Sequence, residues 1–172
     1  MSYRKLIISL IVLSLILTLS GCGGLGLTPP LSEGQEEGTL YLEPADLNVT
    51  PSKDFNVELK TASITNLKGY SVTLTYDPAL ISLKEVTEGP FFFAKGETFF
   101  NKTIDNNKGT VLIDCVLLGP SLSTSGEGTL ANLSFTSLKA GSTSLTFKLV
   151  KTRDTHNKEI ITTKRNSVIR SK

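Results

Sequence analysis

The sequence predicts an all-β protein in which two antiparallel sheets pack face to face as a sandwich. Several stretches alternate apolar and polar residues with a period of two, which is typical of strands with one buried face. Runs rich in turn-forming residues, such as "YDP", "DNNKG" and "SGEG", separate these stretches at short intervals. No window shows a convincing helical period. Strands at this spacing, with polar outer faces, favour a two-sheet sandwich.

The first 21 residues have the three parts of an export signal. Arg4 and Lys5 supply a basic start, a continuous apolar run follows, and small residues close it. The end of this segment, "LSGC", resembles the lipobox of prokaryotic lipoproteins, in which the cysteine is lipidated and the signal is cut before it. The resemblance implies lipidation of Cys22. Two or more acyl chains would then hold the exported protein stably on the outer face of a membrane.

Residues 22–38 are rich in Gly, Pro and acidic residues, so we expect a flexible tether without a core of its own. The remaining residues, 39–172, suit one domain. The predicted organisation is therefore a cleaved signal peptide, a tether and a single sandwich domain.

Three stretches of the domain show the alternation most clearly: "DFNVELKTA" (Asp54–Ala62), "GYSVTLTY" (Gly69–Tyr76) and "STSLTFKLV" (Ser142–Val150). The apolar face of each is predicted to point into the core: Phe55, Val57 and Leu59; Tyr70, Val72, Leu74 and Tyr76; and Leu145, Phe147 and Leu149. The intervening polar residues are predicted to face outward.

The stretch "GTVLIDCVLLGP" (Gly109–Pro120) differs because both of its faces are apolar apart from Asp114. Such a strand is either covered on both sides or presents an apolar patch to a partner. If Cys22 carries a lipid, Cys115 has no disulfide partner, so we expect a buried core thiol. The five phenylalanines of "GPFFFAKGETFF" are expected to fill one end of the core.

Charge argues against nucleic acid as a partner. Of the 18 Lys and Arg residues, two lie in the predicted signal, so the mature chain would carry 16 basic and 16 acidic side chains. A nucleic-acid-binding domain normally has a basic excess.

The residue types also argue against an enzyme and against a resident cofactor or metal. The only histidine, His156, lies in the polar turn "RDTHNKE", and no cluster of His or Cys has metal-ligand spacing. Asp77 in "YDP" is expected to cap its own turn. "DNNKG" fails the EF-hand pattern because Gly109 and Val116 occupy ligand positions, and we expect a hairpin turn there.

Six stretches in order resemble the cohesin family: "LKGYSVTLTYDPALISLKEV", "TEGPFF", "NNKGTVLID", "SGEGTLANLSFTSLKAGSTSLTF", "KLVKTRDTHNKEI" and "NSVI". The resemblance runs from about Gly38 to Ile169. It implies a jelly-roll sandwich of about nine strands that binds a dockerin, a small module that carries calcium in its own loops. Any calcium would therefore belong to the partner rather than to this chain.

In the family, the dockerin lies across one flat sheet face. Carried over to this chain, the resemblance implies that the outer faces of four strands bind the partner: Ser71, Thr73 and Thr75; Asn101 and Thr103; Leu112, Asp114 and Val116; and Ser144, Thr146 and Lys148. Such a set has an apolar centre and a polar rim, as protein interfaces do. It depends on register, because a slip of one residue would invert every side chain.

Two other functions remain open from the sequence. The domain could be a carbohydrate-binding module of the related jelly-roll type, although it lacks Trp and offers only Tyr41 and the "FFF" loop for stacking on sugars. It could also be a structural domain of the envelope or of a secretion apparatus, whose apolar strand makes subunit contacts.

Overall fold

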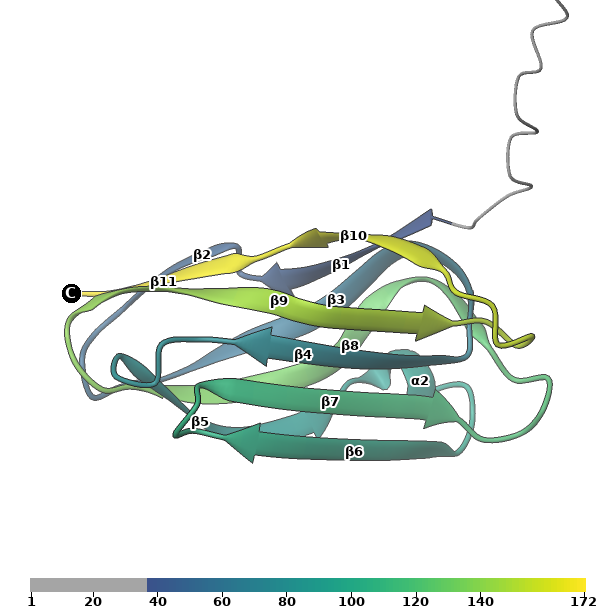
Figure 1. Ribbon diagram of the computed structural model, residues 1–172, viewed down its shortest axis with the longest axis horizontal. Coiled ribbons are helices and arrows are strands. Elements are labelled where there is room, and N and C mark those ends of the chain that lie inside the picture. The colour runs from purple at the N-terminus through teal and green to yellow at the C-terminus, as the bar shows by residue number, and fades with distance from the viewer. Residues whose placement is uncertain (1–36) are drawn as a thin grey trace, which may run out of the picture. The chain divides into compact units, whose positions relative to one another are not determined.

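Residues 37–172, which the computed structural model describes, form two sheets that face each other across one core (Figure 1). The elements in chain order are β1 (Glu37–Glu43), β2 (Asp46–Val49), β3 (Asp54–Leu67), β4 (Gly69–Thr75), β5 (Ile81–Glu88), α2 (Pro90–Phe93), β6 (Thr98–Asp105), β7 (Thr110–Leu117), β8 (Thr124–Ser137), β9 (Gly141–Arg153), β10 (Ile161–Arg165) and β11 (Ser167–Ser171). One sheet has five strands in the order β10-β1-β3-β8-β5. The other has six, in the order β2-β11-β9-β4-β7-β6. The predicted all-β sandwich is confirmed.

The predicted signal peptide, Cys22 and most of the tether lie outside the described residues. The strand β1 begins at Glu37, two residues before the predicted start of the domain at Thr39. Gly38 already packs against Ile64, since a Cβ at Gly38 would lie 2.9 Å from that side chain. Within residues 37–172, no helix is both long enough and apolar enough to cross a membrane.

The first and last strands each pass from one sheet to the other. The cis peptide bond between Glu43 and Pro44 separates β1 in the five-stranded sheet from β2 in the six-stranded sheet. At the other end of the chain, Asn166 separates β10 from β11. β10 pairs with β1, and β11 pairs with β2, both in parallel. If each divided strand is counted once, the sandwich has nine strands, as the resemblance implies. The parallel pairs depart from the antiparallel prediction, because periodicity does not report strand direction.

The core is built from the alternating apolar residues of both sheets. Phe55, Val57 and Leu59 on β3 are buried, as the sequence predicts. Phe135 on β8 is the central residue of an aromatic cluster at one end of the core. Its ring stacks on Phe55 with centroids 5.5 Å apart and meets the edge of Tyr76 at 5.4 Å. Such aromatic pairs stabilise a core beyond the area that they bury.

The phenylalanine-rich stretch closes the opposite end of the core only in part. Phe91 and Phe92 are buried in the single turn of helix α2, and the ring of Phe92 lies 5.5 Å from that of Tyr70. Phe93 and Phe99 are 54% and 59% exposed. Two of the five rings therefore fill the core fully, and Phe99 is left on the outer surface of β6.

The two predicted turns form as expected. Asp77 caps its own turn, because its carboxylate accepts the amide of Ala79 at 2.8 Å. "DNNKG" is a hairpin turn between β6 and β7. The Asp105 carboxylate accepts the amides of Asn107 (3.1 Å) and Lys108 (3.0 Å) there. The Lys108 ammonium and, to a smaller extent, these backbone amides hold the pKa of Asp105 below its ordinary value.

The hairpin turn generates the first testable prediction. Gly109 has φ of +60°, and a Cβ there would lie 2.1 Å from the carbonyl oxygen of Tyr76. Gly126 has φ of +107° but open space around it. Gly126→Ala should therefore cost only backbone strain, about 1–2 kcal/mol of unfolding free energy. Gly109→Ala should cost about 3 kcal/mol or more, because the backbone must also move. Residues 34–172 form one compact unit. Urea unfolding of this unit measures both losses, and equal losses would contradict the close approach at Gly109.

Candidate docking face

The outer surface of β6, β7, β4 and β9, hereafter the candidate docking face, faces the viewer in Figure 1. The side chains of Tyr70, Val72 and Leu74 point into the core, so Ser71, Thr73 and Thr75 between them point outward. The same alternation on β7 buries Val111, Ile113, Cys115 and Leu117 and leaves Thr110, Leu112, Asp114 and Val116 on the outer surface. The sequence register of these two strands is confirmed.

Strand pairing arranges the outward residues in rows that run across the four strands, in the order β6, β7, β4, β9. The rows are Phe99–Val116–Gly69–Arg153, Asn101–Asp114–Ser71–Lys151, Thr103–Leu112–Thr73–Leu149 and Asp105–Thr110–Thr75–Thr146. Nine of the eleven predicted partner-binding residues therefore lie together in these rows. The third row places one leucine on each side of Thr73, at the centre of the face.

The other two predicted residues lie apart from these rows. Ser144 pairs with Val168 on β11, which is beyond the four strands. Lys148 is exposed but has no partner on β4, because β9 bulges there: Thr73 pairs with Leu149, whereas the next residue, Leu74, pairs with Phe147. A bulge adds one residue to a strand and so changes which face its side chains occupy.

The bulge makes one prediction wrong and adds residues that the sequence analysis missed. Leu149 was predicted to be buried with Leu145 and Phe147, but it lies on the outer surface and is 45% exposed. Lys151 and Arg153 follow it onto the same surface. The sequence does contain a signal for this change of face. Lys151 and Arg153 alternate with Val150 and Thr152, so the inward positions after the bulge are even-numbered, whereas Leu145 before it is odd-numbered.

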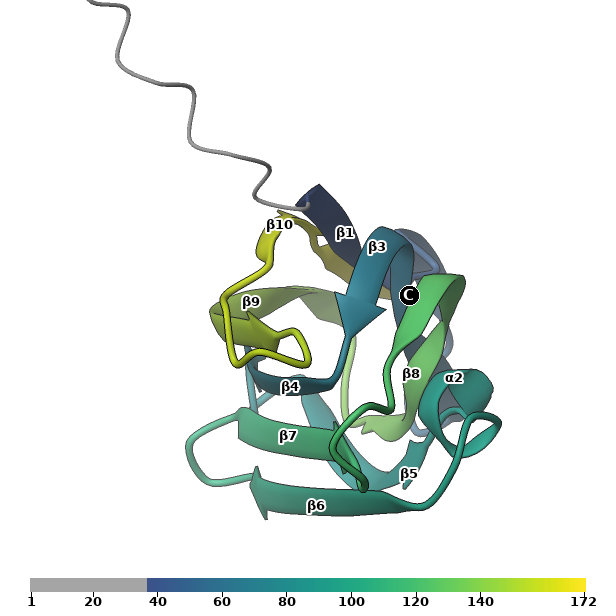
Figure 2. The same cartoon turned by 90° about the vertical axis from the view of Figure 1, so that its right-hand side faces the viewer.

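The face is hollowed at one end, where Gly69 provides no side chain. The hollow has a volume of about 460 Å³, with Gly69, Ser71, Asp114 and Val116 among its lining residues. Phe99 lies on one side, and the β9–β10 loop, residues 154–160, lies on the other. Figure 2 shows this loop next to β4. The hollow is mainly apolar and can accommodate a side chain of a bound protein.

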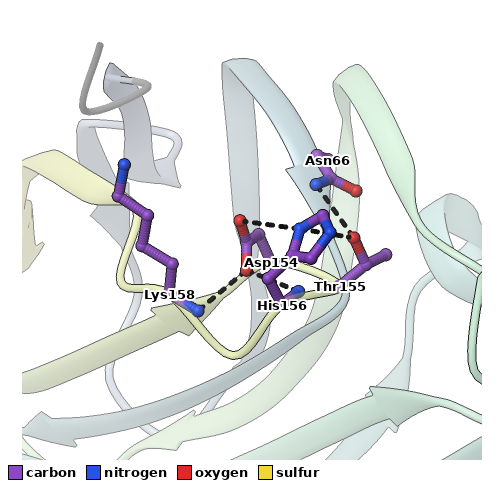
Figure 3. A network of polar contacts seen from close by, with 5 residues as sticks. All are labelled: Asn66, Asp154, Thr155, His156 and Lys158. Atoms are coloured by element: carbon purple, nitrogen blue, oxygen red, sulfur yellow. Dashed lines mark hydrogen bonds and ion pairs between the residues drawn. The ribbon is translucent and has the colours of Figure 1, made fainter. Parts of the chain in front are cut away.

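The wall formed by the β9–β10 loop is fixed by polar contacts (Figure 3). The Asp154 carboxylate accepts the amides of His156 and Lys158, both at 2.8 Å, and the Asn66 amide donates to the Thr155 hydroxyl at 3.1 Å. Burial alone would raise the pKa of Asp154, but these amides outweigh it and hold the pKa below its ordinary value.

The loop offers no catalytic or metal-binding set. His156 is exposed, and its Nδ1 lies 3.8 Å from the Asp154 carboxylate, whose other contacts are to the loop backbone. In the part of the chain that the structure describes, no group of three or more His, Cys, Asp or Glu residues could hold a metal ion. The loop also lines the hollow, through Asp154, Thr155 and Asn157.

Below the face, Cys115 is a buried core thiol, as predicted, with an exposed fraction of 3%. Its sulfur donates to the Glu88 carboxylate at 3.5 Å. Burial and the negative charge of Glu88 raise the pKa of this thiol far above its ordinary value. Burial likewise raises the pKa of Tyr70, whose hydroxyl donates to the Leu130 carbonyl at 3.0 Å. The thiol is therefore protonated and poorly nucleophilic at neutral pH.

The aromatic residues considered for sugar stacking do not form a flat row. Tyr41 lies on the five-stranded sheet, where the Arg165 guanidinium is 4.8 Å from its ring centroid. Phe91 and Phe92 are buried, and Phe93 alone of the "FFF" loop is exposed. No observation in the described residues favours carbohydrate binding.

Comparison with known proteins places the chain in a class of binding modules. The family model described as "Cohesin domain" matches residues 45–168. The chain therefore belongs to the cohesin domain family, whose members are non-catalytic binding modules. No match was found among curated proteins.

Solved structures show the same fold at low sequence identity. A non-cellulosomal cohesin from Archaeoglobus fulgidus is 14% identical with a TM-score of 0.67, over 79% of this chain and 91% of that one. The sixth cohesin of scaffoldin B from Acetivibrio cellulolyticus, solved with a Cel5 dockerin, is 15% identical with a TM-score of 0.69, over 79% and 99%. The cohesin in a type I cohesin–dockerin complex of OlpA from Clostridium thermocellum is 11% identical with a TM-score of 0.68, over 79% of this chain and 99% of that one.

The raised pKa of Cys115 predicts how stability depends on pH. The unfolded thiol loses its proton near pH 8.5, whereas the folded thiol keeps it. The stabilisation is thus complete below about pH 8 and decreases as pH rises, by about 1.4 kcal/mol per unit, or about 2 kcal/mol by pH 10. Urea unfolding of residues 34–172 between pH 7 and 10 measures this. Cys115→Ala should remove that part of the decrease, and an unchanged slope in this variant would contradict the assignment.

Proposed function

We propose that this protein is a docking receptor that captures a dockerin-type module of another protein without covalent chemistry. The observation that carries the proposal is the central row of the candidate docking face, where Leu112 and Leu149 flank Thr73 on a member of the cohesin domain family. Two similar structures were solved as complexes with dockerins, which supports the same class of partner.

The face has the composition that protein interfaces require. Leu112 and Leu149 provide apolar area at the centre, and exclusion of water from that centre is the main source of affinity. Asn101, Thr103, Thr75 and Thr146 surround it with groups that can donate and accept hydrogen bonds. Calcium, if the complex needs it, would be bound by the partner.

The proposed location of this receptor is the outer surface of a prokaryotic membrane. The export signal and the "LSGC" motif support it, since lipidation of Cys22 would leave the domain on a tether of about sixteen residues. A receptor in that position would retain its partner at the cell surface.

The docking proposal is tested by a matched pair of substitutions. Leu149 and Ile161 are both 45% exposed, on opposite sheets. Leu149→Asp should weaken capture of the partner about thirtyfold, because it places a charge at the centre of the interface. Ile161→Asp should leave capture unchanged. The measurement is a pull-down with residues 34–172 in calcium and then in chelator, followed by titration of the recovered protein.

Two results would count against docking as proposed. Equal binding by Leu149→Asp and the unaltered domain would exclude this face. A partner that stays bound in chelator would argue against a dockerin-type module.

The anchoring proposal has its own test. In a bacterial host, the full-length chain should incorporate labelled palmitate and sediment with membranes, whereas Cys22→Ala should do neither, because the thioether cannot form. Cys115→Ala is the matched control and should behave as the unaltered chain does. Labelling that survives Cys22→Ala would refute lipidation at this residue.

A further inference from the structure

The candidate docking face is nearly symmetric about β4. In three of its rows, the residue on β7 and the residue on β9 complement each other across β4. The pairs are Asp114 with Lys151, Leu112 with Leu149, and Thr110 with Thr146. An acid is thus matched by a base, a leucine by a leucine and a threonine by a threonine, at equal distances from the same central strand.

This pattern has a geometric consequence for two copies of the chain. A two-fold axis that runs along β4, in the plane between two facing copies, places β7 of one copy over β9 of the other. Asp114 then faces Lys151 of the second copy, and the reverse pair forms at the same time. Leu112 faces Leu149 in the same way. Such an interface is self-complementary, as two-fold symmetry requires. Facing sheets in protein sandwiches pack in this manner about 10 Å apart.

The strand on the axis is also suited to this arrangement. Ser71 and Thr73 would each lie close to the same residue of the second copy. A hydroxyl group both donates and accepts a hydrogen bond, so two identical hydroxyls can pair. Two identical charges on the axis would repel each other, but Ser71 and Thr73 are both uncharged.

The charged residues of the pattern are available for such contacts. Within residues 37–172, Asp114 and Lys151 form no ion pair, whereas Arg153 pairs with Glu159 at 3.2 Å and Lys108 with Asp105 at 3.1 Å. Asp114 and Lys151 lie two strands apart, about 10 Å between backbones, on either side of Ser71. Leu149 is 45% exposed.

We propose that this domain forms a weak two-fold dimer through the candidate docking face, in which Asp114 pairs with Lys151 of the second copy and Leu112 packs on its Leu149. The three strands that overlap, β7, β4 and β9, are about 4.8 Å apart and seven residues long, so they cover about 330 Å² per copy, or about 660 Å² in total. Interfaces of this size are reversible and weak, so we expect a dissociation constant on the order of 100 μM. The dimer uses the same surface as a docked partner, so the two states exclude each other.

Charge reversal tests the dimer without any other protein. Sedimentation equilibrium of residues 34–172 between 10 μM and 1 mM measures the dissociation constant. Asp114→Lys alone and Lys151→Glu alone each create two like-charge pairs per dimer, and each should weaken association at least tenfold. An equimolar mixture of the two variants restores both pairs, as does the double variant D114K/K151E. Both should associate within about threefold of the unaltered domain.

Controls separate a specific interface from general effects of charge and from misfolding. Thr87→Lys adds a positive charge on exposed β5 of the opposite sheet and should leave association unchanged. Thermal unfolding confirms that each variant is folded. Lys151 is exposed, so Lys151→Glu remains informative if Asp114→Lys fails to fold.

Three results would overturn the dimer: a monomeric domain at 1 mM, association that ignores both charge reversals, or a mixture that stays monomeric. Because the assay contains no partner, its failure leaves the docking proposal standing. Conversely, a domain that dimerises as described but captures no dockerin-type module would refute docking alone.

Discussion

The pairing of β4 with β7 on one side and β9 on the other is the constraint on which the rest of this domain depends. Tyr70, Val72 and Leu74 fill the core, and this alone requires Ser71, Thr73 and Thr75 to point outward. A slip of one residue would bury three polar side chains and expose the apolar ones. The composition of the candidate docking face is therefore fixed by the energetics of the core.

The bulge in β9 is the main exception to that regularity, and it changes the chemistry of the face. Without it, Leu149 would be buried and Lys148 would take its place in the row of Leu112 and Thr73. With it, Leu149 joins Leu112 on the outer surface, and the basic residue Lys151 enters the row of Asp114. A polar sheet surface thus gains an apolar centre and a charge opposite to the one already there. Both are properties of interfaces rather than of solvated sheets.

The two proposed interactions use this surface in different ways. A docked module would need the apolar centre and the hollow beside Gly69, whereas a second copy would need the symmetry of β7 and β9 about β4. If both occur, they compete, and the local concentration of the receptor would decide how much of the face is free. Cys115 and the β9–β10 loop support the surface from below and from the side. The Cys115 thiol donates to Glu88 of the opposite sheet, and the Asp154 carboxylate accepts amides of its own loop.

The sequence by itself determined the main strands, most of their inward faces and most of the candidate docking face, because alternation with a period of two reports which side of a strand is buried. It also indicated the turns at Asp77 and Asp105 and the buried thiol of Cys115. Only the tertiary structure decided the parallel pairs at the sheet edge, the single turn of α2 and the outward position of Leu149. Strand direction and bulges are set by the neighbouring strand, to which a pattern within one strand does not respond. The sequence therefore specified most of the buried residues, and the pairing of β9 with β4 decided which exposed residues lie side by side on the outer surface.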